Sequence, residues 1–366
     1  MDLKAWLRLL DGNILKVSAD RIGLLLATTL VALIHTLASP FVSAWERRQQ
    51  ISSRMLTDDQ SPLFIIGHSR SGTTLLHELL CCVHGLRAPT TYQCFNPRHF
   101  LLTERLVARV FNWALPKVRG FDNVEFGWSS PQEDEFALLM MGASSPYRRI
   151  AFPCSGDQLN GIDITQLTLQ QRLHWTESLM LFVRRLMFND SRRLVLKNPF
   201  HTARISTLLR LFPGAKFIFI TRNPFNMIPS AIKLWTYLDF FHGLSSSCMP
   251  NYMEYSLALF AIIETAYLRD KPLLASNNLV EIRFEDLIAD PVRTLDSIIL
   301  AFGMQDLQID KAALQSTTSK ISPGFPDQYH LTIEEKQRIY LSTKEYCWRY
   351  GYAQDHPART DDLSTA

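Results

Sequence analysis

The pattern of apolar and polar residues predicts strands that alternate with helices from residue 61 onward. Short apolar runs typical of buried strands lie at 61–67 (SPLFIIG) and 216–221 (KFIFIT), and two further strands are expected at 193–197 (RLVLK) and 278–284 (NLVEIRF). Helical spacing of the apolar residues marks 73–82, 133–141 and 169–188. This alternation predicts an α/β fold of three layers, in which helices flank a central parallel sheet.

A long uncharged stretch precedes this region. Residues 22–45 (IGLLLATTLVALIHTLASPFVSAW) contain no formally charged side chain, and as a helix they are long enough to cross a bilayer core of about 30 Å. They predict an N-terminal hydrophobic helix that spans a membrane once, lies in the lipid interface, or packs on the catalytic domain. Lysines and arginines flank the stretch on both sides, so the charge distribution favours neither orientation.

A polar linker at 49–60 (QQISSRMLTDDQ) separates this stretch from the first predicted strand. We therefore divide the chain into an N-terminal hydrophobic segment, residues 1–55, and a catalytic domain, residues 56–366. We expect the protein to associate with a membrane, as a single-pass protein if the helix spans it. The side of the membrane on which the domain lies stays open.

The strongest chemical signal is a small polar loop between the first strand and the next helix. Residues 67–74 read GHSRSGTT. Glycines let a backbone bend until several N–H groups face one anion, and the helix start adds its positive dipole end. An arginine can form two hydrogen bonds with phosphate or sulfate oxygens. The fold is therefore P-loop-like, and the candidate anion-binding residues are Arg70, Ser71, Gly72, Thr73 and Thr74.

This loop lacks the lysine of nucleotide triphosphatases. Their loops read GxxxxGK[ST], whereas Thr73 occupies the lysine position here. No acidic residue follows the strand at 216–221 to help hold magnesium, because Arg222 stands there instead. The loop therefore suits a single phosphate beside a group that needs no metal.

A second basic site is predicted at the end of the strand 216–221. Arg222 follows the strand, and Ser230 comes eight positions later near the start of the next helix. An arginine and a helical serine at this separation can contact one phosphate from two sides. Together with the loop, they predict a clamp for a second phosphate.

These two motifs resemble those of sulfotransferases that use 3′-phosphoadenosine 5′-phosphosulfate (PAPS). PLFIIGHSRSGTTLL is similar to their 5′-phosphosulfate loop, and KFIFITRNPFNMIPSAI to their 3′-phosphate motif. LVLKNPFH, EIRFEDLIADP and PQEDEFALL resemble further segments of the bacterial-type and tyrosylprotein branches. The similarity covers roughly residues 61–303. It implies transfer of a sulfuryl group from PAPS to an acceptor hydroxyl or amine, with release of 3′,5′-adenosine bisphosphate (PAP) and without a metal.

The chain departs from the family pattern at two positions. Arg70 stands where cytosolic small-molecule sulfotransferases have lysine, which separates the chain from that branch. Phe284 stands where tyrosylprotein enzymes have a tyrosine near the adenine, so a stacking surface remains without its hydroxyl. The segment 319–329 is expected to close over the nucleotide and to bring Lys320 near a phosphate.

Sulfuryl transfer needs a base for the acceptor proton and positive charge around the moving group and the leaving phosphate. The resemblance assigns Arg70 to the leaving phosphate and Lys197 to the bridging oxygen or the sulfuryl group. For the base we favour Glu133 and then Glu135, from the acidic cluster 133–135. Acids in a first helical turn are also ordinary capping residues.

Two histidines are rival bases. His201 lies close in sequence to Lys197, and His77 lies on the helix that follows the phosphate loop. The acceptor is expected to be a glycan, lipid, peptide or small metabolite, which the sequence does not distinguish. Segments 89–97, 121–130 and 234–253, rich in aromatic and polar residues, are candidate walls of its cleft.

Bulk composition changes this picture little. The net charge of +3 is too small to indicate a nucleic-acid partner. The six cysteines show no zinc-binding spacing. Two other functions stay open: an ATP-dependent phosphotransferase, disfavoured by Thr73, and a membrane-tethered protein without catalytic activity.

Overall fold

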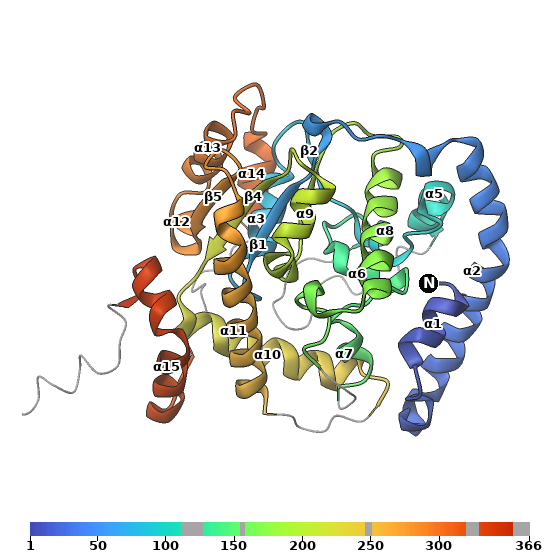
Figure 1. Ribbon diagram of the computed structural model, residues 1–366, viewed down its shortest axis with the longest axis horizontal. Coiled ribbons are helices and arrows are strands. Elements are labelled where there is room, and N and C mark those ends of the chain that lie inside the picture. Colours follow the sequence, from blue (N-terminus) through green and yellow to red (C-terminus); the bar gives the residue numbers. More distant parts are fainter. Residues whose placement is uncertain (111–126, 154–157, 246–250, 320–328, 354–366) are drawn as a thin grey trace, which may run out of the picture.

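The central element of the fold is a sheet of five parallel strands. The computed structural model describes residues 1–110, 127–153, 158–245, 251–319 and 329–353 (Figure 1). The strands are β1 (Leu63–Gly67), β2 (Leu86–Arg87), β3 (Arg193–Lys197), β4 (Lys216–Thr221) and β5 (Leu279–Arg283). Their order in the sheet is β2-β3-β1-β4-β5. The predicted three-layer α/β fold is thus confirmed.

Strand β1 lies in the middle of the sheet and its residues are buried on both faces. It pairs in parallel with β3, where Ile65 faces Lys197, and with β4, where Gly67 faces Ile220. Three of the four predicted runs, β1, β3 and β4, are almost completely buried, whereas β5 is an edge strand with partly buried residues. Two details differ from the prediction: the last strand ends at Arg283, and the two-residue strand β2 is too short for a sequence signal.

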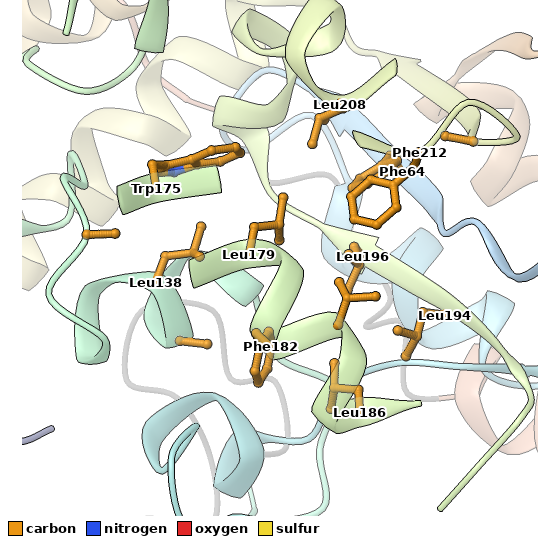
Figure 2. Close-up of a cluster of buried hydrophobic side chains, with 14 of the residues drawn as sticks. Phe64, Leu138, Trp175, Leu179, Phe182, Leu186, Leu194, Leu196, Leu208 and Phe212 are labelled. Carbon is orange, nitrogen blue, oxygen red and sulfur yellow. The ribbon is translucent and has the colours of Figure 1, made fainter. Parts of the chain in front are cut away.

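Successive strand residues face opposite helical layers. Phe64 and Ile66 pack with α6 (Asp134–Met140), α8 (Leu169–Leu186) and α9 (Ile205–Leu211), in the cluster that Figure 2 shows. Leu63 and Ile65 face the other layer. That layer consists of α3 (Thr73–Leu80), α12 (Phe284–Ala289), α13 (Pro291–Ala301) and α14 (Lys311–Thr318).

The remaining helices surround one end of the sheet and its flanks. They are α4 (Thr91–Phe95), α5 (Phe100–Val110), α7 (Arg148–Ala151), α10 (Pro224–His242), α11 (Tyr252–Asp270) and α15 (Ile333–Tyr350). α10 begins after Asn223, whose side chain accepts a hydrogen bond from the Phe225 backbone N–H. This cap fixes the turn between β4 and α10, which carries Arg222.

The N-terminal segment is a helical pair on the side of the catalytic domain. α1 (Leu3–Leu10) packs beside α2 (Ile22–Arg48), and α2 forms the outer edge of the molecule in Figure 1. Within the described residues, α2 is the one helix long and apolar enough to cross a membrane. The stretch 49–60 follows it as an irregular connection with short 3₁₀ turns.

Candidate active site

The phosphate loop lies at the carboxyl end of β1, where the sheet topology places ligands. Gly67 and Gly72 both have positive φ, and both sit against other parts of the chain. A Cβ on Gly67 would lie 2.6 Å from the Ile220 carbonyl oxygen, and one on Gly72 would lie 2.2 Å from Phe284. Arg70 has a φ of 69°, an uncommon backbone conformation for a residue with a side chain. The loop is therefore fixed in one shape by contacts on both sides.

Arg70, Ser230 and Arg222 come together beside this loop. The Arg70 Nε donates to Ser230 Oγ at 3.0 Å, and the Arg222 Nη1 donates to the Arg70 carbonyl oxygen at 2.9 Å. The Arg222 guanidinium also lies 4.4 Å from the centre of the Phe284 ring. The two phosphate motifs predicted from the sequence thus meet in one place. Phe284 is fully buried, and its ring packs against both Arg222 and Gly72.

Lys197 connects the phosphate loop to the acidic cluster. Its Nζ donates to Thr74 Oγ1 at 3.2 Å and to Glu133 Oε1 at 2.5 Å. The other oxygen of Glu133 accepts a hydrogen bond from the Tyr147 hydroxyl. Lys197 is almost completely buried, whereas the Glu133 side chain is 15% exposed. Glu133 is therefore within reach of a ligand that contacts the loop.

The other two acids of the cluster have different partners. Asp134 pairs with His201 at 2.7 Å, and both side chains are fully buried. Glu135 forms two hydrogen bonds with Arg204, of 2.6 and 3.3 Å, and also accepts one from Asn198. Each acid of the first turn of α6 is thus tied to the segment that follows β3. This arrangement orients Glu133, which precedes the helix as its N-cap residue.

His77 has a structural role inside the protein. Its side chain is buried, and its ring nitrogen lies 3.0 Å from the Val195 carbonyl oxygen, to which it can donate. Burial, reinforced by the positive charge of Lys197, lowers the pKa of His77 to about 3. The ring is therefore neutral and holds α3 to β3.

Sequence reasoning missed two contributors to the site. Tyr147 hydrogen-bonds Glu133, and the Tyr346 hydroxyl accepts a hydrogen bond of 3.1 Å from the Arg222 backbone N–H. Both lie outside the motifs, and no local pattern distinguishes them from other aromatic core residues. Burial raises the pKa of the Tyr147 hydroxyl well above its ordinary value, so it stays a donor to the Glu133 carboxylate.

Several predictions fall on or near parts of the chain that the structure does not describe. Lys320, most of 319–329, and parts of 121–130 and 234–253 lie outside the described residues. Of segment 89–97, Tyr92 and Cys94 are buried in the core, while Thr90 pairs with Pro131 next to the acidic cluster. Within the described ranges, no three His, Cys, Asp or Glu side chains are grouped so as to hold a metal ion.

Comparison with known proteins identifies the family. A family model described as the sulfotransferase family matches residues 62–308. The omega-hydroxy-beta-dihydromenaquinone-9 sulfotransferases Stf3 of Mycobacterium bovis and Mycobacterium tuberculosis are each 32% identical over 360 residues, covering 97% of this chain and 91% of theirs.

Solved sulfotransferases share the fold at lower identity. STF9 of Mycobacterium avium aligns with a TM-score of 0.59 and 17% identity, over 84% of this chain and 80% of its own. STF1 of Mycobacterium tuberculosis aligns with a TM-score of 0.56 and 17% identity, over 93% and 90%. The family match excludes the ATP-dependent phosphotransferase considered from the loop alone. The chain belongs to the sulfotransferase family.

Proposed function

We propose that this sulfotransferase moves a sulfuryl group from PAPS to a hydroxyl of its acceptor and releases PAP. The observation that carries the proposal is the bridge made by Lys197. One ammonium group contacts both Thr74, at the start of the loop helix, and Glu133, the partly exposed acid. A donor bound at the loop and an acceptor bound at Glu133 would therefore meet at Lys197. A nitrogen acceptor, such as an amine, would use the same geometry.

The donor would bind through its two phosphate-bearing ends. Backbone N–H groups of Gly72 and Thr73, with the side chains of Thr74 and Arg70, would hold the 5′-phosphosulfate, while the Ser71 N–H donates to the His68 carbonyl oxygen and shapes the loop. Arg222 and Ser230 would hold the 3′-phosphate, supported by Phe284 beneath the guanidinium. Because Arg70 already contacts Ser230, the two ends would share one positive region. Lys320 would add a further charge from the segment 319–329.

The transfer step needs no metal in this proposal. The acceptor oxygen attacks the sulfur in line with the bridging oxygen, and the bond between sulfur and that oxygen breaks. The acceptor proton passes to the Glu133 carboxylate, and the bridging electron pair stays on the 5′-phosphate of PAP. Lys197 and Arg70 stabilise the charge that develops on the bridging and phosphate oxygens. Side chains that are in place before the reaction thus stabilise this negative charge.

Glu133 is the favoured base because of its accessibility. Asp134, Glu135 and His201 are fully buried and already paired with one another or with Arg204. A base must come within hydrogen-bond distance of the proton that it removes, and among these groups only Glu133 reaches the loop through Lys197. We therefore assign Glu135 and His201 to the positioning of the cluster.

We further propose that the acceptor hydroxyl belongs to a lipid. Two relatives are named for an omega-hydroxylated dihydromenaquinone, and the N-terminal helix of this chain carries an exposed apolar face. Both observations favour a lipid over a glycan, peptide or small metabolite. Transfer to an omega-hydroxylated prenylquinone, and none to simple sugars or to a tyrosine peptide, is the expected outcome in a radiolabelled sulfate assay.

Calorimetric titration with PAP, in the absence of magnesium, tests the donor proposal. We expect PAP to bind tightly, ADP and ATP weakly, and Arg222→Ala to lose most of the affinity for PAP. Loss of a charged hydrogen-bonding partner of a phosphate typically costs about 2–5 kcal/mol, a factor of thirty or more.

The control variant is Arg148→Ala. It removes an exposed arginine that pairs with Asp11, a residue outside both phosphate motifs. It should bind PAP like the wild type. Equal or stronger binding of ATP, with a requirement for magnesium, would overturn the donor proposal.

A further inference from the structure

The outer face of α2 presents a continuous apolar stripe to solvent. Large side chains recur every four residues in two neighbouring rows, 26-30-34 and 33-37-41, and are 41–81% exposed. We define the stripe by six residues: Leu26, Leu30, Leu33, Ile34, Leu37 and Phe41. α2 is the outermost helix at its edge of the molecule (Figure 1). A soluble surface does not leave such a patch uncovered without a partner.

The opposite face of α2 is attached to α1 at two places and to the catalytic domain at its end. Near its start, Thr29 accepts a hydrogen bond of 2.9 Å from the Trp6 indole. In the middle, Thr36 accepts one of 2.8 Å from the Leu3 backbone N–H. At its end, Glu46 forms a buried bidentate ion pair with Arg185, of 2.6 and 2.8 Å. The helix is therefore held alongside the catalytic domain.

This attachment is incompatible with a helix that crosses a bilayer. If α2 spanned the membrane in this arrangement, the groups beside its middle would lie in the hydrocarbon core. These include Asp2 and Arg98, which pair at 3.3 Å next to the Leu3 contact. Charged groups at that depth are strongly unfavourable. The stripe can enter lipid without moving α2 only if the helix axis is parallel to the membrane plane.

Charge at both ends of α2 fits a lipid surface. Lys16 precedes the helix, and Arg47 and Arg48 end it, and all three are exposed. Residues 1–55 contain seven Lys and Arg residues against four Asp and Glu residues. A helix in the interface places such end groups among lipid headgroups, where each basic residue gains from anionic lipid.

The composition of the stripe argues against a second protein chain. Protein interfaces are enriched in Tyr, Trp, Phe, Met and Arg, whereas five of the six stripe residues are Leu or Ile and only Phe41 is of an enriched type. Further exposed apolar side chains lie at the start of α2. Leu15 is 95% exposed, and Phe240 and Phe241, whose carbonyl oxygens are both 3.4 Å from Arg21, are more than half exposed. These side chains add exposed apolar surface near the start of α2.

We propose that α2 docks flat on an anionic lipid bilayer, with the stripe inserted at the boundary between headgroups and acyl chains. The catalytic domain stays attached to the opposite face of the helix and remains entirely on one side of the membrane. This inference concerns attachment and does not depend on the donor chemistry. It deepens the proposed function in one respect, because it attaches the catalytic domain to the surface that would hold a lipid acceptor.

Vesicle flotation with the purified full chain tests the proposal. We expect binding to vesicles of phosphatidylglycerol and phosphatidylcholine, and a decrease in binding of at least about a hundredfold for Leu30→Glu/Leu37→Glu. Arg47→Gln/Arg48→Gln should weaken binding to these vesicles by about fivefold per arginine, and should have little effect on pure phosphatidylcholine.

The matched control is Leu300→Glu/Leu341→Glu. It introduces the same charges at comparably exposed leucines on α13 and α15, and it should float like the wild type. Calorimetry with PAP on every variant separates the two proposals, because PAP binding is expected to be unchanged by the stripe substitutions. Failure of the wild type to bind PAP would refute the donor site while leaving the flotation result valid.

Labelling distinguishes a flat helix from a spanning one. Lys16→Cys and Arg48→Cys are placed at opposite ends of α2 in chain bound to sealed vesicles, and a membrane-impermeant maleimide is added outside. A flat helix predicts labelling of both positions above that of the unsubstituted chain. Labelling of one end only, unchanged flotation of the stripe variant, or a dimer in solution that this variant dissociates without any vesicle binding would each overturn the proposal.

Discussion

At the scale of single residues, the acidic cluster shows how neighbours in sequence acquire different roles. Three consecutive acids end in three environments because the first turn of α6 directs them to different parts of the segment after β3. Glu133 contacts Lys197 and remains partly exposed, whereas Asp134 and Glu135 are fully buried in pairs. The sequence predicted an acid here and ranked Glu133 first. It could not reveal the ion pairs, because they depend on the packing of α6 against residues more than sixty positions away.

The first prediction concerns Glu133. Glu133→Gln keeps the shape of the side chain and removes the carboxylate that would accept the proton. We expect kcat for sulfuryl transfer to fall by about 10²–10⁴-fold, while the affinity for PAP changes little. Stopped assays with labelled PAPS, together with PAP calorimetry, measure the two quantities separately.

Glu135→Gln is the comparison for this experiment. It leaves Arg204 buried with an incomplete set of partners, and breaking a buried pair in this way typically costs about 3–5 kcal/mol. Its effect should therefore appear as a lower free energy of unfolding, with measurable kcat in the protein that remains folded. A Glu133→Gln enzyme with wild-type kcat would disprove the assignment of the base.

The second prediction concerns the pH dependence of stability through His77. Its pKa is about 3 in the folded protein, because the ring is buried, and about 6.5 when unfolded. Between these values the unfolded state binds one more proton, so stability is full above pH 6.5 and falls as the pH decreases towards 3. At pH 5 the loss amounts to about 2 kcal/mol from this residue alone.

Urea unfolding at pH 7.5 and pH 5 measures this loss. His77→Gln lacks the titrating ring and should lose about 2 kcal/mol less than the wild type on going to pH 5. His84→Gln replaces an exposed histidine just after the same helix, α3. It should behave like the wild type. Identical losses in the wild type and in His77→Gln would show that the ring is not held neutral.

At the scale of elements, the loop and α12 form one unit through Gly72 and Phe284. The third prediction is that Gly72→Ala lowers the affinity for PAP by about tenfold or more. The added Cβ would lie 2.2 Å from the Phe284 ring, so either the loop or the ring beneath Arg222 must move. Calorimetry with PAP measures the change.

Two further variants separate the causes of that loss. Gly303 also has a positive φ but has no neighbouring atom in the way. Gly303→Ala therefore reports the backbone cost alone, about 1 kcal/mol of stability, with unchanged PAP affinity. Gly72→Ala/Phe284→Leu should recover part of the affinity, because the smaller side chain makes room. No recovery would mean that backbone strain at residue 72 accounts for the loss.

The elements themselves were largely predictable, and their arrangement was not. Apolar runs between helical patterns predicted β1, β3 and β4, which are enclosed on both faces, and also the partly buried edge strand β5. β2 escaped notice because a strand of two residues, paired with β3, is too short to leave a pattern in the sequence. The strand order, and with it the meeting of Arg70, Ser230 and Arg222, depends on contacts between distant segments. A linear pattern does not contain such contacts, although the phosphate motifs resembled those of a known family.

At the scale of the whole molecule, the N-terminal pair and the active site are connected through α6. A Cβ on Gly142, just beyond the end of this short helix, would lie 2.9 Å from Ala5 of α1. Glu133 lies at its other end. The helix proposed to contact the membrane is therefore linked to the proposed base through α1 and α6.

The fourth prediction tests whether α2 is an integral part of the folded domain. Glu46 and Arg185 are both more than nine-tenths buried, so Glu46→Ala leaves a guanidinium with only the Pro97 carbonyl oxygen as a partner, at 3.2 Å. If α2 stays docked, the free energy of unfolding should fall by about 3–5 kcal/mol. Detachment of the end of α2 would limit that loss. The detachment would then appear as faster hydrogen exchange in α2, with little change in the sheet.

Asp11→Ala is the control, since it breaks the exposed pair with Arg148 and such pairs contribute at most about 1 kcal/mol. Equal effects of the two substitutions on unfolding and on exchange would mean that α2 is not fixed to the domain. α2 would then be free to span the membrane, and its contacts would no longer require a flat orientation.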